Sequence, residues 1–203
     1  MKKAIVFLAA VALTVSASAQ NFSYGLKGGL NLSTISKAEG AKMKPSIYAG
    51  AFAEYKFNDY FGISPELIYS RQGTTTSIKD EFEDMKSQVR LNYINVPVLA
   101  KIYLADALSL DLGPQVGFLI GAKSYAKGTI EGEKVDGTTD VKKAFQSVDF
   151  SFGMGLTYNI GKFLVQARYN LGLTDTAKYA DGEEKSKDKY RNNVIQVGVG
   201  YRF

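Results

Sequence analysis

Six charged residues recur on the polar face of alternating segments, and they are the candidates for chemistry in this chain. They are Lys27, Glu54, Glu66, Lys101, Asp111 and Arg168. Three are basic and three are acidic, so their side chains could neutralise one another if the fold brings them together. A buried charge needs such a partner, because removing one member of a buried ion pair costs about 3–5 kcal/mol. These residue types therefore predict a structural ion-pair network.

The composition argues against catalysis. The 203 residues include no Cys and no His, which excludes Ser-His triads, thiolate nucleophiles and the usual zinc ligands. Gly153-Met154-Gly155 and Gly198-Val199-Gly200 are not nucleotide-binding loops, because no helix follows either of them. We therefore expect no enzyme, no catalytic residue, no cofactor and no bound metal.

One acidic stretch could ligate Ca²⁺ through Glu131, Glu133, Asp136 and Asp140. Its spacing does not match the EF-hand loop. We interpret it as part of a solvated loop.

The first 19 residues predict a signal peptide. Lys2 and Lys3 precede an apolar run from Ala4 to Val15, and Ala17-Ser18-Ala19 offers small residues for cleavage. Residues 20–203 would then form the exported domain, which makes nucleic acid an unexpected partner. No later segment has 18 consecutive apolar residues.

The exported part alternates between apolar and polar residues with a period of two, which predicts β-strands. In 22–33, for example, Leu26 and Leu30 share one face while Lys27 and Asn31 share the other. Eight such strands are expected, at about 22–33, 46–57, 61–73, 89–104, 107–122, 148–159, 163–173 and 195–203.

The connections alternate in length. Short ones follow the second, fourth and sixth strands, and long ones lie near 34–45, 74–88, 123–147 and 174–192. Outer-membrane barrels have short periplasmic turns and longer extracellular loops. The prediction is an all-β protein, an eight-stranded antiparallel up-and-down transmembrane β-barrel. It would lie in the outer membrane of a Gram-negative bacterium with both termini in the periplasm.

Alternation alone also fits a soluble, lipocalin-like barrel with its faces reversed. Glycine and small polar residues on one face suit a narrow lumen and favour the membrane alternative. Aromatic residues at strand ends, typical of membrane–water girdles, favour it too. They are Tyr24, Phe57, Phe61, Tyr69, Tyr93, Tyr103, Tyr158, Phe163, Tyr169, Tyr201 and Phe203. Tyr201 and Phe203 also predict a C-terminal signal for the barrel-assembly machinery.

Several stretches together resemble the PorT-type outer membrane β-barrel family. They are Tyr24–Ser33, Phe52–Tyr55, Pro65–Ser70, Tyr93–Lys101, Leu112–Pro114 and Ala167–Leu173. The resemblance implies an eight-stranded barrel of the OmpA/OmpX size class. It also implies a link to protein secretion for some members, and it supplies no catalytic residues.

The six charged residues all lie about 3–5 residues from the periplasmic ends of their strands, or roughly 10–17 Å. If residues at equal distances from the periplasmic ends of their strands lie at one height, neighbouring strands would pair Lys27 with Glu54 and Glu66 with Lys101, and Arg168 could reach Asp111 across the lumen. We expect them to close the lumen, although separately hydrated charges remain an alternative.

Prolines inside three strands should interrupt the hydrogen-bond ladder, so we expect bulges at Pro65, Pro97 and Pro114, whereas Pro45 should precede its strand.

The expected function is a non-enzymatic outer-membrane barrel with a structural, accessory or surface-interaction role. Its partners would be outer-membrane lipid, the assembly machinery and an unidentified protein bound by the extracellular loops. The alternatives are a narrow solute channel and a soluble ligand-binding barrel in the periplasm.

Overall fold

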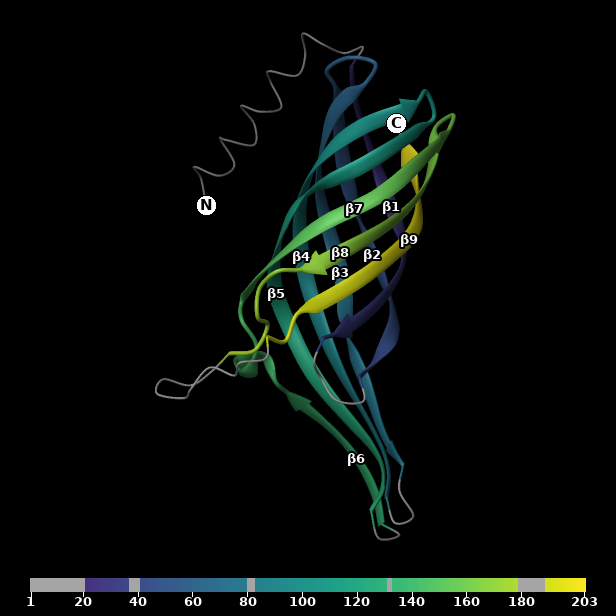
Figure 1. Cartoon of the computed structure of the whole chain (residues 1–203). Helices are drawn as coiled ribbons and strands as arrows, with labels where there is room; N and C mark the ends of the chain where they lie inside the picture. Colours follow the sequence, from purple (N-terminus) through teal and green to yellow (C-terminus); the bar gives the residue numbers. More distant parts are fainter. Residues whose placement is uncertain (1–20, 37–40, 80–82, 131–132, 179–188) are drawn as a thin grey trace.

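A tall antiparallel barrel makes up almost all of the described part of the chain in the computed structural model (Figure 1). The structure describes residues 21–36, 41–79, 83–130, 133–178 and 189–203. The signal peptide predicted for residues 1–19 lies outside this part. The strands are β1 (Phe22–Ile35), β2 (Ala41–Lys56), β3 (Phe61–Lys79), β4 (Glu83–Ala105), β5 (Leu108–Ile130), β6 (Glu133–Asp140), β7 (Val148–Ile160), β8 (Phe163–Gly172) and β9 (Asn192–Arg202).

Eight of these strands form the closed ring, as the sequence predicts. Each pairs with its neighbours along the chain, β4 pairs with β5, and β1 pairs with β9 to complete the circle. The one remaining described strand, β6, is not part of the ring. It pairs with β5 and lies at the end of the sheet order. No helix in the described residues is long and apolar enough to cross a membrane.

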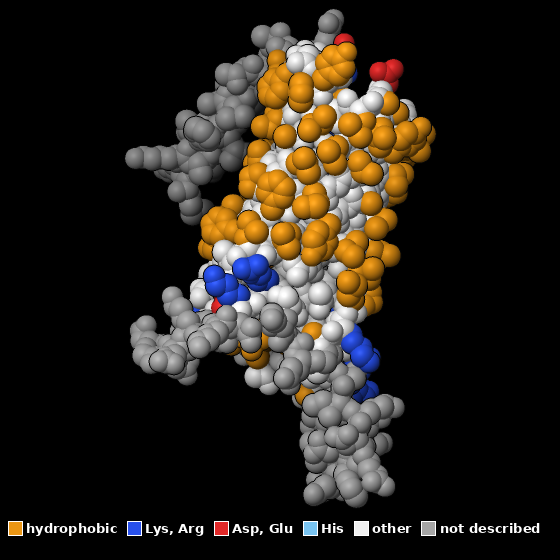
Figure 2. All heavy atoms as spheres, viewed as in Figure 1, with side chains coloured by type: hydrophobic (Ala, Val, Ile, Leu, Met, Phe, Trp, Pro, Cys, Tyr) orange, Lys and Arg blue, Asp and Glu red, His pale blue; other side chains and the backbone are white. Residues whose placement is uncertain are grey.

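The barrel turns its apolar face outward. On β1 and β9, Leu30 is 60% exposed and Val197 is 50% exposed, whereas Asn31 and Gln196 are buried. Figure 2 shows the outward side chains as a broad hydrophobic band over the upper part of the molecule, on the face that it draws. This arrangement is the reverse of a water-soluble ligand-binding barrel, which packs apolar side chains inside.

The strands continue far into segments predicted to be loops. Residues 74–88 belong mostly to β3 and β4, and 123–147 contains the end of β5, all of β6 and the short 3₁₀ helix η2 (Lys142–Ala144). The loop prediction was wrong there because it equated polarity with irregular structure, although β-branched Thr74, Thr75 and Thr76 favour strands. The extended ends of β4, β5 and β6 project from the ring on the side opposite the C-terminus (Figure 1).

The three prolines inside strands behave differently from the prediction. Ladder pairs are missing next to Pro65, Pro97 and Pro114, but the register is the same on both sides of each gap. The missing N–H therefore removes hydrogen bonds without inserting a residue. A register shift occurs instead between Met43 and Tyr48, around Pro45, which lies inside β2.

Aromatic side chains form a cluster at the end of the barrel with short turns. Tyr24 and Phe203 have ring centroids 5.5 Å apart, and Tyr201 lies 5.2 Å from Phe163 and 5.4 Å from Phe203. Two residues assigned to a girdle were placed wrongly, because Tyr93 and Tyr103 are buried in the lumen.

Candidate functional site: the closed lumen

The lumen is filled by three levels of side chains that recur every four residues along a strand. On β1 the levels are marked by Lys27, Asn31 and Ile35, and β5 repeats them with Asp111, Gln115 and Leu119. Every second residue of a strand faces the lumen, so two residues four positions apart both face it, about 13 Å from each other along the strand. The levels are charged, polar and apolar in that order from the short-turn end.

Glu66 of β3 is the centre of one half of the charged level. Its carboxylate accepts two hydrogen bonds from the Arg168 guanidinium, at 2.8 and 2.9 Å, and lies 2.5 Å from Lys27 Nζ. Lys27 also donates to Gln166 Oε1 at 3.0 Å, and Gln166 donates to Tyr48 Oη at 3.0 Å. The bidentate geometry is the strong form of an Arg–carboxylate pair.

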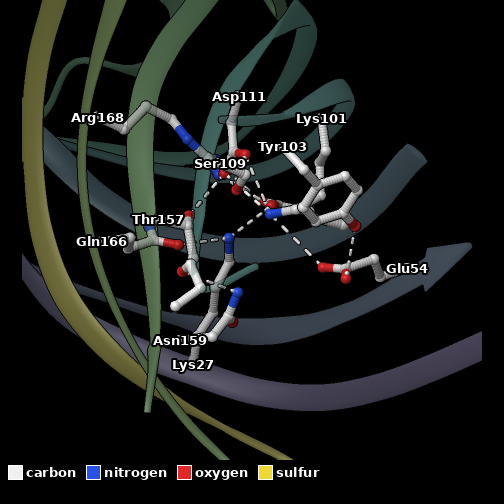
Figure 3. A network of polar contacts seen from close by, with 12 residues as sticks. Lys27, Glu54, Lys101, Tyr103, Ser109, Asp111, Thr157, Asn159, Gln166 and Arg168 are labelled. Atoms are coloured by element: carbon white, nitrogen blue, oxygen red, sulfur yellow. Dashed lines mark hydrogen bonds and ion pairs between the residues drawn. The ribbon is translucent and has the colours of Figure 1, made fainter. Parts of the chain in front are cut away.

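Lys101 of β4 is the centre of the other half. Its Nζ lies 3.0 Å from Asp111 and 3.5 Å from Glu54, and all three side chains are buried (Figure 3). Asp111 also accepts from Ser109 at 2.8 Å and from Thr157 at 2.6 Å.

Glu54 has two further contacts in this half. It accepts a hydrogen bond from Tyr103 at 2.9 Å and forms an ion pair with Arg202 at 3.2 Å.

The structure brings together all six charged residues singled out from the sequence. They pair differently from the pairs expected when residues at equal distances from the strand ends are matched. The residue opposite Glu54 on β1 is Ser23, four residues before Lys27. Likewise, the residue opposite Lys101 on β3 is Gly62, four residues before Glu66. Closing a barrel requires such a stagger between tilted strands. Lys27 and Arg168 therefore both meet Glu66.

Sequence reasoning missed several members of the charged level. Arg202 alternates onto the polar face of the last strand, so its parity was the available signal, but it is the final residue of β9. Tyr103 was assigned to the membrane girdle. Ser109, Thr157 and Gln166 carry no charge, and only their inward parity marks them.

Very little space remains within the charged level. The cavity at this level, lined among others by Lys27, Glu66, Lys101 and Asp111, has a volume of about 10 Å³ accessible to the centre of a water molecule. A single water molecule needs about 10–15 Å³ by the same measure. The side chains therefore fill the lumen at this height.

The middle level is a network of amide and hydroxyl groups. Gln196 donates to Asn31 Oδ1 at 2.9 Å, Asn31 donates to Ser70 Oγ at 2.9 Å, and Asn170 donates to Gln196 Oε1 at 3.0 Å. Gln72 donates to Ser70 at 2.9 Å. These contacts join β1, β3, β8 and β9 across the lumen.

The third level is apolar and is covered by segments beyond the ring. Its buried core comprises Ile35, Leu91, Tyr93, Leu119 and Ala122. Val141 and Phe145, on either side of η2, and Tyr190 pack against this core. Phe145 forms a β-bridge with Ala177, and Gln146 N donates to Thr176 O at 2.9 Å. The segment between β6 and β7 and the segment that follows β8 are thereby bonded to each other over this end of the lumen.

Only part of the acidic stretch considered for Ca²⁺ lies in the described residues. Asp136 and Asp140 are exposed, and Glu131 lies outside the described part. No group of three or more acidic residues in that part is placed to hold a metal ion.

Comparisons with known proteins identify the barrel's relatives. A family model described as an outer membrane protein beta-barrel domain matches residues 18–178. A search of curated proteins gives no match.

Similar solved structures include Ail, the attachment invasion locus protein of Yersinia pestis. It has 16% identity and a TM-score of 0.48, over 91% of this chain and 100% of that chain. Neisserial surface protein A has 13% identity and a TM-score of 0.45, over 90% and 97%. OprG from Pseudomonas aeruginosa has 13% identity and a TM-score of 0.38, over 90% and 96%.

Proposed function

Because this chain belongs to the family of outer membrane protein β-barrel domains, we propose that it is a closed, non-enzymatic barrel that presents a projecting β-sheet at the cell surface to a protein partner. The observation that carries the proposal is the length of β4 and β5, 23 residues each. A tilted strand of about 9–11 residues crosses the bilayer. More than half of each strand is therefore available outside the membrane.

The end of this projecting sheet suits partner binding. Within the described chain β6 pairs with β5 alone and forms the edge of the sheet. Backbone N–H and C=O groups along such an edge can pair with a strand of another protein. The exposed Asp136, Thr138 and Asp140 keep this edge polar.

The filled lumen supports a structural role over a solute channel. The charged level leaves room for about one water molecule, and the apolar core blocks the same path at the other end. In planar bilayers we expect the refolded protein to show no steady conductance. Arg168→Ala should also be silent, because the apolar level remains intact. Steady ion flow through the unaltered protein would contradict this proposal and favour the channel.

We place the short turns and both termini in the periplasm, and the projecting sheet outside the cell. An epitope inserted between Gly137 and Thr138 should then bind antibody on intact cells. The same epitope between Gly161 and Lys162, in the turn between β7 and β8, is the matched control and should bind only after lysis. The opposite labelling pattern would reverse the orientation.

A photo-crosslinking residue at exposed Thr138 tests the partner role. We expect it to give a discrete adduct in intact cells, while the same residue at exposed Tyr60, in the turn between β2 and β3, gives a different pattern. If Thr138 gives no specific adduct, the surface-interaction role is wrong even if the barrel is correctly oriented.

Two finer predictions belong to the same proposal. The resemblance to PorT-type barrels suggests a contribution to protein secretion, which a deletion strain would test by the secreted fraction of its exported proteins. Tyr201 and Phe203 face outward beside Phe163 and Tyr24, which supports their proposed use as a signal for the assembly machinery.

A further inference from the structure

A basic pocket opens in the outer wall of the barrel where β2, β3 and β4 run past the apolar band. Its volume is about 610 Å³. It is lined by Lys42, Met43, Lys44, Pro45, Ser46, Ile47, Arg71, Thr75, Lys86, Gln88 and Arg90. The lumen described above does not use this pocket.

The pocket results from the break in the ladder at Pro45. Proline cannot donate a backbone hydrogen bond, and the register between β2 and β3 shifts between Met43 and Tyr48. The carbonyl oxygen of Arg71 is bonded instead by the Asn31 side chain at 2.8 Å and by Ser46 Oγ at 2.6 Å. The two strands therefore separate locally, and the gap forms the hollow.

Positive charge dominates the lining. Five of the lining residues are Lys or Arg, and no acidic residue is among them. Arg90 is held in place because its guanidinium lies 4.1 Å from the Tyr125 ring centroid and donates to Gln88 at 3.4 Å. A preorganised arginine is suited to bidentate contacts with phosphate, and the lysines add point charges.

The position of the pocket indicates a membrane ligand. Met43 and Ile47, on its rim, are both 53% exposed and belong to the outward apolar face. Lys42 and Lys86 are exposed further toward the projecting sheet. Apolar contacts and cationic contacts therefore meet at the level of the lipid headgroups.

We propose that this pocket binds the phosphorylated sugar headgroup of an outer-leaflet glycolipid of the lipid A type, with an acyl chain lying against Met43 and Ile47. The proposal rests on the orientation proposed above, which places this side of the barrel in the outer leaflet. The phosphates contact Arg71, Arg90 and the neighbouring lysines. A soluble phosphate would match these cations but would leave the apolar rim unused.

Native mass spectrometry of the refolded full chain in a neutral detergent tests the site, with diphosphoryl lipid A as the probe. Removing two charged contacts by Lys42→Gln with Arg71→Gln should weaken binding at least about tenfold. The matched control is Lys127→Gln with Lys143→Gln, which removes the same charge from exposed positions outside the pocket and should leave the affinity unchanged. The gel mobility of unheated samples shows that each variant is folded.

Equal losses in the pocket and control variants would overturn the proposal, since binding would then follow net charge alone. Inorganic phosphate that binds as well as lipid A would overturn the lipid as the source of the phosphate. The proposal would be supported if the unaltered protein bound monophosphoryl lipid A more weakly than diphosphoryl lipid A, and if the pocket variant bound the two lipids equally. The assay uses purified protein and does not depend on orientation, so its outcome is independent of the epitope experiment.

Discussion

Glu66 is the single residue on which one half of the charged level depends. It faces two cations, Lys27 at 2.5 Å and Arg168 through two hydrogen bonds, and its side chain is 3% exposed. Without its charge, Lys27 and Arg168 would remain close together in a poorly hydrated lumen. Breaking a buried pair is costly for this reason, even where the intact pair contributes little net stability.

Glu66→Gln should therefore lower the free energy of unfolding by about 3–5 kcal/mol. The control is Asp59→Asn, which removes an ion pair with Lys56 at 3.3 Å in which Asp59 is 93% exposed, and should cost less than about 1 kcal/mol. The chain has no Trp whose fluorescence could report unfolding. Urea unfolding can be followed by far-UV circular dichroism instead. Similar losses in the two variants would show that the network does not stabilise the barrel.

The inward direction of all six charged residues could be read from the sequence, because parity along a strand fixes the face. Their partners could not. The stagger between strands is a property of ring closure, so neither Lys27 nor Glu54 carries a local sign of the four-residue offset between them. The amide level was missed because Asn31 and Gln196 resemble any other polar residues of alternating strands.

At the scale of elements, the seam between β1 and β9 depends on glycine. A Cβ atom built on Gly198 would collide with Tyr48 Oη and with the carbonyl oxygen of Gly28. One built on Gly29 would collide with the carbonyl oxygen of Val197. Small residues at this seam let Tyr48 reach across the lumen to Gln166.

Gly198→Ala should destabilise the barrel by about 1–3 kcal/mol, the usual cost of overpacking a well-filled interior. Gly121→Ala in β5 is the control, since its Cβ would meet only Asn92 Nδ2 at an ordinary 3.6 Å. We expect little change in its urea midpoint. If Gly198→Ala lowered the stability no more than Gly121→Ala does, β1 and β9 could move apart at this seam without destabilising the barrel.

The number and order of the barrel strands could be predicted, because period-two alternation is strong over long segments. Strand ends could not. Polar residues such as Lys123 and Thr138 look the same in a hydrated strand as in a loop. They are in strands because Lys123 of β5 pairs with Asp140 of β6, and Thr138 of β6 pairs with Tyr125 of β5.

At the scale of the whole molecule, the outward apolar band holds the barrel in the membrane. Val197 lies in this band opposite Leu30, and both face away from the lumen. The band must contact hydrocarbon, so a charge introduced there should be costly in lipid.

Val197→Arg should reduce the stability of the barrel in lipid vesicles by about 2–4 kcal/mol if the residue lies near the midplane. Thr138→Arg on exposed β6 adds the same charge outside the band and should change stability by less than about 0.5 kcal/mol. Reversible refolding into vesicles measures both. If Val197→Arg were harmless, this surface would not be facing lipid.

The ring of strands also determines when the interior can form. Lys27 bonds Gln166, 139 residues away, and Asn31 bonds Gln196, 165 residues away. The first link joins β1 to β8 and the second joins β1 to the last strand, β9, and contacts between distant parts of a chain form slowly. The protein should therefore mature in one late step that dehydrates all the lumen charges together, and a chain halted before that step would have neither the seal nor most of its stability.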